Sequence, residues 1–222
     1  MNYDAFTDYF YADSVMRSIH LPKAKEFYEI IVSRLGMSPS SILVLNRTWL
    51  SEWMQSAGID VTFPADMKAG DKFDLIIGLD EILTRDIDEA SQKKHIMQIV
   101  GLLDTNGMMV ASLRDYRNTN GHKKVLGDTC FNMVGTDEIV TVELNQIDPR
   151  DKQSWFQKYH MVTNSKTFEC IDGGVHRTLY FKQLAKYCAD SGAGQFGVLK
   201  DVYWRSHLRK TPEHIVWAMR NN

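Results

Sequence analysis

A strand predicted over residues 42–46 ends in two polar residues, Asn46 and Arg47. Ligands of open α/β sheets bind at the carboxyl ends of the parallel strands, so both side chains are candidates for polar contacts to a ligand. The alternative is a structural turn, because Thr48 is a favourable N-cap for the helix that follows. Glycine, which lets a backbone approach a cofactor closely, does not occur here until Gly58.

Two adjacent carboxylates, Asp80 and Glu81, follow the strand predicted over 73–79. Such a pair can orient a cationic or hydroxyl-bearing ligand, or one member can act as a general base. The alternative places Glu81 with Asp86 and Asp88 in a solvated acidic rim at the start of a helix.

A third polar group, Arg114, Tyr116 and Arg117, follows the strand predicted over 108–113. An arginine pair at this edge would bind a carboxylate or phosphate group. The alternative is a charged loop without a ligand.

Two histidines, His160 and His176, lie in the middle of the chain and are candidates for a general acid or base. The alternative is that both are structural. The nearby sequence Asp172-Gly173-Gly174 is typical of a turn that closes a hairpin.

Alternating strands and helices would position the groups at the sheet edge. Short apolar runs predict buried strands, and apolar residues at three-to-four spacing predict helices. The strands are 42–46, 59–63, 73–79 and 108–113, and the helices are 3–18, 24–35 beyond Pro22, 48–57 and 87–103. The order of strand, helix and strand implies a right-handed crossover between parallel strands.

The segment 115–174 has a different pattern, because its apolar residues alternate at 139–144, 155–162 and 167–171 and so predict antiparallel strands. A helix over 177–191 and two strands, 198–208 and 214–220, are predicted to close the chain. We therefore expect one α/β domain over 1–222, a three-layer α/β/α sandwich with a mostly parallel sheet. N-terminal helices occupy 1–36, a β-rich insertion occupies 115–174, and an antiparallel hairpin forms the C-terminal part of the sheet.

Composition argues against several kinds of site. Cys130, Cys170 and Cys188 are far apart and form no CxxC pair, so we expect neither a disulfide framework nor a metal site. The net charge of −2 argues against nucleic acid as a partner. A local basic and aromatic edge between Trp204 and Lys210 is better interpreted as a charged tip that discourages edge-to-edge pairing.

The chain shows no signal for a membrane or for export. No apolar run reaches the ~18 residues that span a bilayer. The sequence begins Met-Asn-Tyr-Asp-Ala-Phe, which lacks the basic and apolar regions of a secretory signal. We therefore expect a cytoplasmic protein, in its own cell or in a host cell.

Several stretches of the sequence resemble the motifs of one known enzyme family. FDLIIGLD at 73–80 looks like that family's fourth strand and following loop, and QIVGLLDTNGMMV at 98–110 is similar to its helix, turn and fifth strand. PEHIVWAMR at 212–220 resembles its seventh strand, and YDAF at 3–6 with Tyr9 resembles the helix that covers the cofactor. By these stretches the chain resembles the class I S-adenosylmethionine-dependent methyltransferases. The resemblance implies a Rossmann-like fold, S-adenosylmethionine as the cofactor, and methyl transfer to an unidentified acceptor.

The resemblance also implies roles for individual residues. Arg114, Tyr116 and Arg117 would contact the substrate. Asp66 would lie near the ribose if 59–63 is the family's second strand, and near adenine if it is the third. The residues implied at the cofactor are Tyr9, Asn46, Arg47, Asp66 and Asp80.

The chain departs from the family pattern in two ways. Where the family has a GxGxG-type loop after its first strand, this chain has Asn46-Arg47-Thr48-Trp49-Leu50. Only 26 residues separate Asn46 from Phe73, which is room for one helix and one strand where the family has two of each. Two hypotheses follow: an active methyltransferase, or a cofactor-free protein of the same fold with a structural, assembly or regulatory role and a protein partner.

Overall fold

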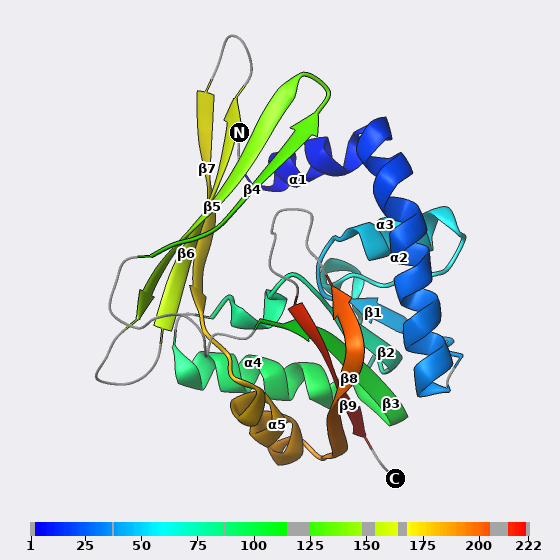
Figure 1. The fold of residues 1–222 in the computed structure, drawn as a ribbon. Coiled ribbons are helices and arrows are strands. Elements are labelled where there is room, and N and C mark those ends of the chain that lie inside the picture. The colour runs from blue at the N-terminus through cyan, green and yellow to red at the C-terminus, as the bar shows by residue number, and fades with distance from the viewer. Residues whose placement is uncertain are drawn as a thin grey trace.

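The computed structural model describes residues 3–36, 38–86, 88–114, 125–147, 154–163, 168–204 and 213–220. These residues form two sheets, with helices packed on the larger one (Figure 1). The larger sheet has the strand order β1-β2-β3-β9-β8. Its strands are β1 (Ile42–Val44), β2 (Phe73–Gly78), β3 (Leu103–Leu113), β8 (Ala193–Trp204) and β9 (Glu213–Arg220).

The pairing within the larger sheet agrees with the predicted architecture. The strands β1, β2 and β3 pair in parallel, whereas β9 pairs antiparallel to both β3 and β8. The residues between the predicted helix 87–103 and the predicted strand 108–113 form an irregularity inside β3, because Phe73 pairs with Leu103 and Leu75 already pairs with Met108. The chain thus has a parallel core and an antiparallel C-terminal hairpin.

Helices cover both faces of the larger sheet. One apolar cluster joins it to α1 (Tyr3–Ala12), α2 (Ser14–Leu35) and α3 (Trp49–Ser56). A second cluster joins the opposite face to α4 (Glu89–Gly101) and α5 (Phe181–Asp190). This gives the three layers that the sequence predicts.

The break between the N-terminal helices differs from the prediction. Asp13 separates α1 from α2. Its carboxylate accepts a hydrogen bond from the Met16 backbone N–H at 2.8 Å and so caps α2. Pro22, predicted to interrupt the helix, lies inside α2. The helix then ends at Gly36, whose left-handed backbone is the common end of a helix.

The segment predicted as a strand over 59–63 is reduced to a single parallel bridge between Thr62 and Leu43. Two backbone hydrogen bonds of 2.9 Å, from Val44 to Thr62 and from Thr62 to Ile42, hold it beside β1. In the doubly wound order this is the position of a second strand. No further described strand lies outside it, so one βα unit is absent from this edge of the described sheet.

The middle of the chain forms the second sheet, which has four antiparallel strands in sequence order. The strands are β4 (Val125–Val134), β5 (Asp137–Ile147), β6 (Ser154–Thr163) and β7 (Phe168–Arg177). The sequence predicts three of them and misses β4. The hairpin turn predicted at 172–174 is wrong, because β7 continues through these residues with a register shift opposite Lys158 and Tyr159.

Candidate functional site at the carboxyl edge of the larger sheet

The place where such folds bind ligands lies between β1 and β2. From β1 the chain runs outward to α3 and Thr62, then returns to β2 on the other side of β1. This reversal is the switch point at which open α/β sheets bind ligands, at the carboxyl ends of the strands. Two 3-10 turns flank it, η1 (Pro64–Asp66) and η2 (Ile82–Thr84).

Asn46 ties the ends of the two central strands together. Its side-chain oxygen accepts a hydrogen bond from the Leu79 backbone N–H at 3.3 Å. Thr48 is the N-cap of α3, as the structural alternative predicts, and it forms a capping box with Ser51. The turn after β1 is therefore held by contacts within the chain.

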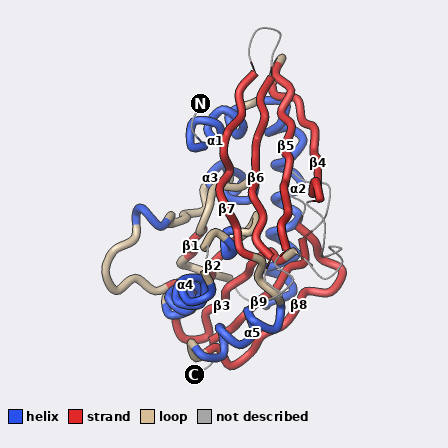
Figure 2. The backbone as a smooth tube through the Cα atoms, turned by 90° about the vertical axis from the view of Figure 1, so that its left-hand side faces the viewer, coloured by secondary structure: helices blue, strands red, loops and turns tan. Residues whose placement is uncertain are grey.

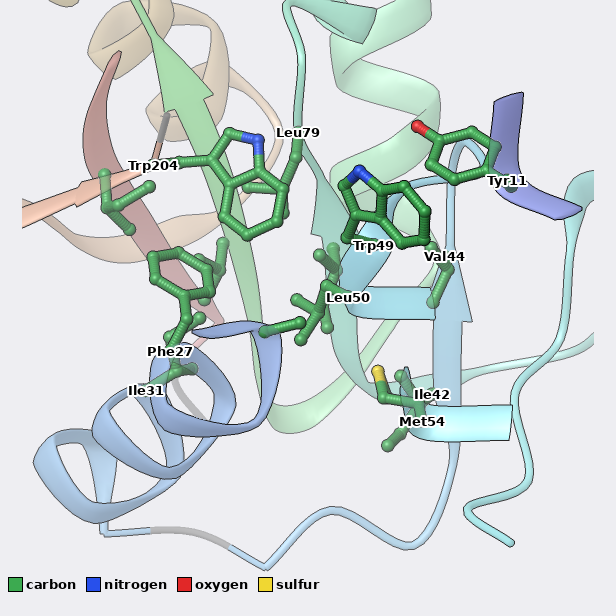
Figure 3. Packing of buried hydrophobic residues seen from close by; sticks show 14 of the residues in the cluster. Tyr11, Phe27, Ile31, Ile42, Val44, Trp49, Leu50, Met54, Leu79 and Trp204 are labelled. Atoms are coloured by element: carbon green, nitrogen blue, oxygen red, sulfur yellow. The ribbon is translucent and has the colours of Figure 1, made fainter. Parts of the chain in front are cut away.

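Trp49, the first residue of α3, fills the space beside this turn. Trp49 is 0% exposed, and its ring lies beside that of Tyr11 from α1 (Figure 3). The indole stacks on His20 with centroids 5.2 Å apart, and it meets Tyr11 edge-on at 4.8 Å. Phe10 lies 5.7 Å away, and Leu50, next along α3, is also fully buried.

Arg47 belongs to an ion-pair network that ties the N-terminal helices to α3. Its Nε lies 2.6 Å from Glu52, and its guanidinium also pairs with Asp8. Glu52 is buried and pairs with Arg17 of α2 at 2.8 Å. The Tyr11 hydroxyl donates to the Arg47 carbonyl at 3.3 Å, and the guanidinium lies over the Tyr11 ring.

Tyr9 faces the second sheet. Its hydroxyl lies 2.5 Å from the Asp137 carboxylate and 3.0 Å from the Val134 carbonyl. Burial, and next the hydrogen bond to Asp137, raise the pKa of Tyr9 to about 12. Nearby, Asp13 accepts from the Gly135 backbone N–H at 3.1 Å, so α1 and its junction with α2 are fastened to the β4–β5 turn.

The two carboxylates after β2 have different surroundings. Both residues have left-handed backbones, with φ of 56° at Asp80 and 60° at Glu81. Asp80 accepts a hydrogen bond of 2.5 Å from the indole N–H of Trp204. Glu81 is 0% exposed, so the solvated rim predicted for it is wrong, whereas Asp88 is exposed and caps α4.

Of the two candidate histidines, the structure brings His176 to this edge. His176 is buried in β7, and its Nδ1 lies 3.0 Å from the Thr84 hydroxyl. That hydroxyl donates to the Glu81 carbonyl at 2.7 Å. His160 lies in β6, opposite Ile171, and its side chain is outside the described part of the chain.

Of the three substrate-contact candidates that follow β3, the structure describes Arg114 alone. Arg114 is 8% exposed, and the neighbouring Ser112 hydroxyl donates to the buried Glu213 carboxylate of β9. Tyr116 and Arg117 lie outside the described residues. Asp66 is exposed in η1.

The partners of these side chains come from distant parts of the sequence. Trp204 and Asp80 are 124 positions apart, and His176 and Thr84 are 92 apart. No spacing rule predicts such pairs. Of these four residues, only Asp80 directly follows a strand that the sequence predicts.

A metal site and a membrane span each place specific requirements on the described residues. The described residues contain no group of three or more His, Cys, Asp or Glu side chains that could hold a metal ion. Among the same residues, no helix has the length and hydropathy of a membrane span.

Comparison with known proteins identifies the fold. No protein-family model and no curated protein matches the sequence. A methyltransferase from Clostridium acetobutylicum is similar over 99% of both chains, with 15% identity and a TM-score of 0.61. The sugar N-methyltransferase KedS8 from Streptoalloteichus is similar over 99% of this chain and 93% of its own, with 12% identity and a TM-score of 0.59.

A third structure, CalS10 from Micromonospora echinaspora, is an amino pentose methyltransferase solved with S-adenosylmethionine bound. It is similar over 90% of this chain and 91% of its own, with 11% identity and a TM-score of 0.57. Identities this low carry information about the fold alone. The chain therefore has the fold of the class I S-adenosylmethionine-dependent methyltransferases.

Proposed function

We propose that this chain is a methyltransferase-fold protein that does not use S-adenosylmethionine and acts as a binding or assembly subunit. The observation that carries the proposal is Trp49, a fully buried indole at the turn where the family's glycine loop passes the cofactor. Glycines serve there because the backbone must approach the ligand closely. An indole packed on His20 and Tyr11 takes that space for the protein's own core.

The polar residues of the edge support the same proposal. Asn46 bonds to the Leu79 backbone, Arg47 pairs with Glu52 and Asp8, and Asp80 bonds to Trp204. Each contact would have to be exchanged for one to a ligand, and loss of Arg47 would leave the buried Glu52 with Arg17 as its remaining cationic partner in this network. Binding of S-adenosylmethionine at this edge would therefore first require these contacts within the protein to break, which costs free energy.

The reduced strand beside β1 also supports the proposal that the protein does not use S-adenosylmethionine. The family holds the cofactor ribose with an acid at the end of its second strand, and here that strand is one bridge at Thr62. The nearest acid that follows, Asp66, is exposed in η1. The residues present thus do not fit the cofactor, and we assign no step of methyl transfer to them.

Thermal unfolding with millimolar S-adenosylmethionine or S-adenosylhomocysteine tests the proposal. A ligand of micromolar affinity at such a concentration would stabilise the native state by about 4 kcal/mol. We expect no rise in melting temperature for this chain, and a clear rise for the Clostridium acetobutylicum methyltransferase treated identically. A comparable rise for this chain would overturn the proposal and favour the enzyme hypothesis.

A further inference from the structure

The larger sheet ends at β8, on the side opposite to β1. Among the described strands β8 pairs with β9 alone, so its other side presents backbone N–H and C=O groups. The helix α5 lies beside the first part of this strand (Figure 1, Figure 2). The pairing with β9 is regular over 195–199 and shifts in register at both ends of this stretch. The stretch 195–199, which we call the β8 edge, is therefore a regular template for a further strand.

The β8 edge lacks the features that usually protect an edge strand. Proteins protect such strands with charged side chains, proline or irregular backbone. The sequence of the β8 edge is Gln-Phe-Gly-Val-Leu, which contains neither a charge nor a proline. The irregular positions lie outside it, and Val198 within it is 37% exposed. This part of β8 is thus open to pairing.

Aromatic side chains support both faces of the β8 edge. Phe196 shares a face with Val198, and its ring lies 4.8 Å from the ring of Phe181 in α5. Phe181 is itself 41% exposed. On the other face the indole of Trp217 lies across Gly197, where a Cβ would be 2.9 Å from the ring. A strand added beside β8 would find apolar surface above and below it.

Two exposed lysines flank this apolar surface. Lys182 follows Phe181 in α5, and Lys200 follows Leu199 at the end of the β8 edge. In the part of the chain that the structure describes, neither lysine forms an ion pair with an acidic side chain. Such a surface is complementary to a partner that carries carboxylates.

We propose that the β8 edge binds an extended segment of a partner protein as an additional strand. The segment has apolar residues at alternate positions and acidic residues on either side of them. In this mode of recognition the main-chain hydrogen bonds give affinity, and the alternate side chains give specificity. The inference rests on the proposed function only in that a binding subunit needs a partner.

The charges favour this segment over other occupants. Two paired β8 strands would bring Lys182 and Lys200 of both copies into one interface, and residues 195–200 contain no acid to compensate them. Nucleic acid binds through many cationic contacts to phosphates, and the β8 edge itself has no charge. An acidic segment meets both the apolar surface and the lysines.

A fluorescently labelled peptide, Glu-Thr-Val-Thr-Val-Thr-Glu with an amidated end, is the probe, and fluorescence anisotropy is the measurement. In an extended strand its valines and glutamates lie on one face. We expect saturable binding by the wild type, and weaker binding of a matched peptide with lysine in place of both glutamates. Val198→Lys should weaken binding of the acidic peptide by about tenfold. Val15→Lys, at an exposed position of α2, is the control and should bind as the wild type does.

Exchange of the two charges separates strand recognition from unspecific adhesion. The double variant Lys182→Glu with Lys200→Glu should prefer the basic peptide, and circular dichroism establishes that each variant is folded. Absence of saturable binding by the wild type, or equal affinity in Val198→Lys, would overturn the proposal. Self-association in sedimentation velocity that Val198→Lys removes and Val15→Lys leaves intact would also overturn it, because a second copy would then occupy the edge. Cofactor binding is measured at the opposite edge of the sheet, so each of the two proposals can fail alone.

Discussion

Trp49 is the residue on which the proposed function rests. It begins α3 at the switch point, and its ring contacts aromatic residues of both N-terminal helices. A side chain at this place serves the hydrophobic core and at the same time excludes other occupants from the space it fills. The contribution to stability and the exclusion of a ligand can be measured separately.

Trp49→Ala should destabilise the protein by about 3–5 kcal/mol, because it leaves a large cavity in a close-packed region. Urea unfolding measures the change. Trp53→Ala is the control, since Trp53 lies on the same helix but is only partly buried. The free energy of unfolding should fall clearly less in this variant. Equal losses for the two variants would show that Trp49 has no special role in the packing.

His20 makes stability depend on pH. Burial, and to a smaller extent Lys23, lower the pKa of His20 from 6.5 to about 4. The unfolded chain therefore binds this proton at a higher pH than the folded chain, so stability falls as the pH drops from 6.5 toward 4. In His20→Phe, the part of the stability loss that His20 causes should disappear. Urea unfolding at a pH above 6.5 and at a pH between 6.5 and 4 would detect the difference. Parallel losses in the variant and the wild type would show that His20 is not responsible.

At the scale of elements, the N-terminal helices connect the two sheets. They reach the turn after β1 through Asp8 and Arg17, and they reach the β4–β5 turn through Tyr9 and Asp13. This arrangement differs from a helix that only covers a cofactor. It explains how the turn after β1 can be closed by the chain itself.

The irregular start of β3 depends on one glycine. A Cβ at Gly107 would lie 2.7 Å from the Phe73 carbonyl and 2.9 Å from backbone atoms of Asp104, which cannot move away easily. We expect Gly107→Ala to lower the free energy of unfolding by ~1–3 kcal/mol.

The control is Gly101→Ala at the end of α4, where a Cβ would meet nothing within 4 Å. Alanine there should be neutral or stabilise by about 0.5–1 kcal/mol, because glycine is unfavourable in helices. Urea denaturation of both variants checks the pair. If the two substitutions had the same effect, the close backbone approach at Gly107 would not be a constraint.

At the scale of the whole molecule, the sequence predicts the larger sheet because its signals are local. Apolar runs and turn residues mark β1, β2, β3 and the final hairpin, and their order fixes the parallel core. β4 was missed because its sequence contains Gly127, Asp128 and Asn132, which are typical of loops. The strand predicted over 59–63 shrinks to one bridge because no described strand pairs with its outer side.

The candidate site was predictable only in part. The sequence identifies the sheet edge, and the structure places Asn46, Asp80 and Arg114 at strand ends along it. It does not identify the partners that engage these side chains, such as Trp204, because tertiary contacts over such separations leave no pattern in the sequence. The glycine-free turn with Trp49 and the short span from Asn46 to Phe73 are the sequence signals that favour the cofactor-free hypothesis.

Calorimetric titration of the purified protein with S-adenosylhomocysteine tests the central claim most directly. The account predicts no heat of binding at millimolar ligand, because the protein's own side chains fill and hold the turn after β1. A class I methyltransferase of the same fold, titrated in parallel, should give a heat of binding and so show that the S-adenosylhomocysteine sample is able to bind. Saturable binding with micromolar affinity by this chain would contradict the account.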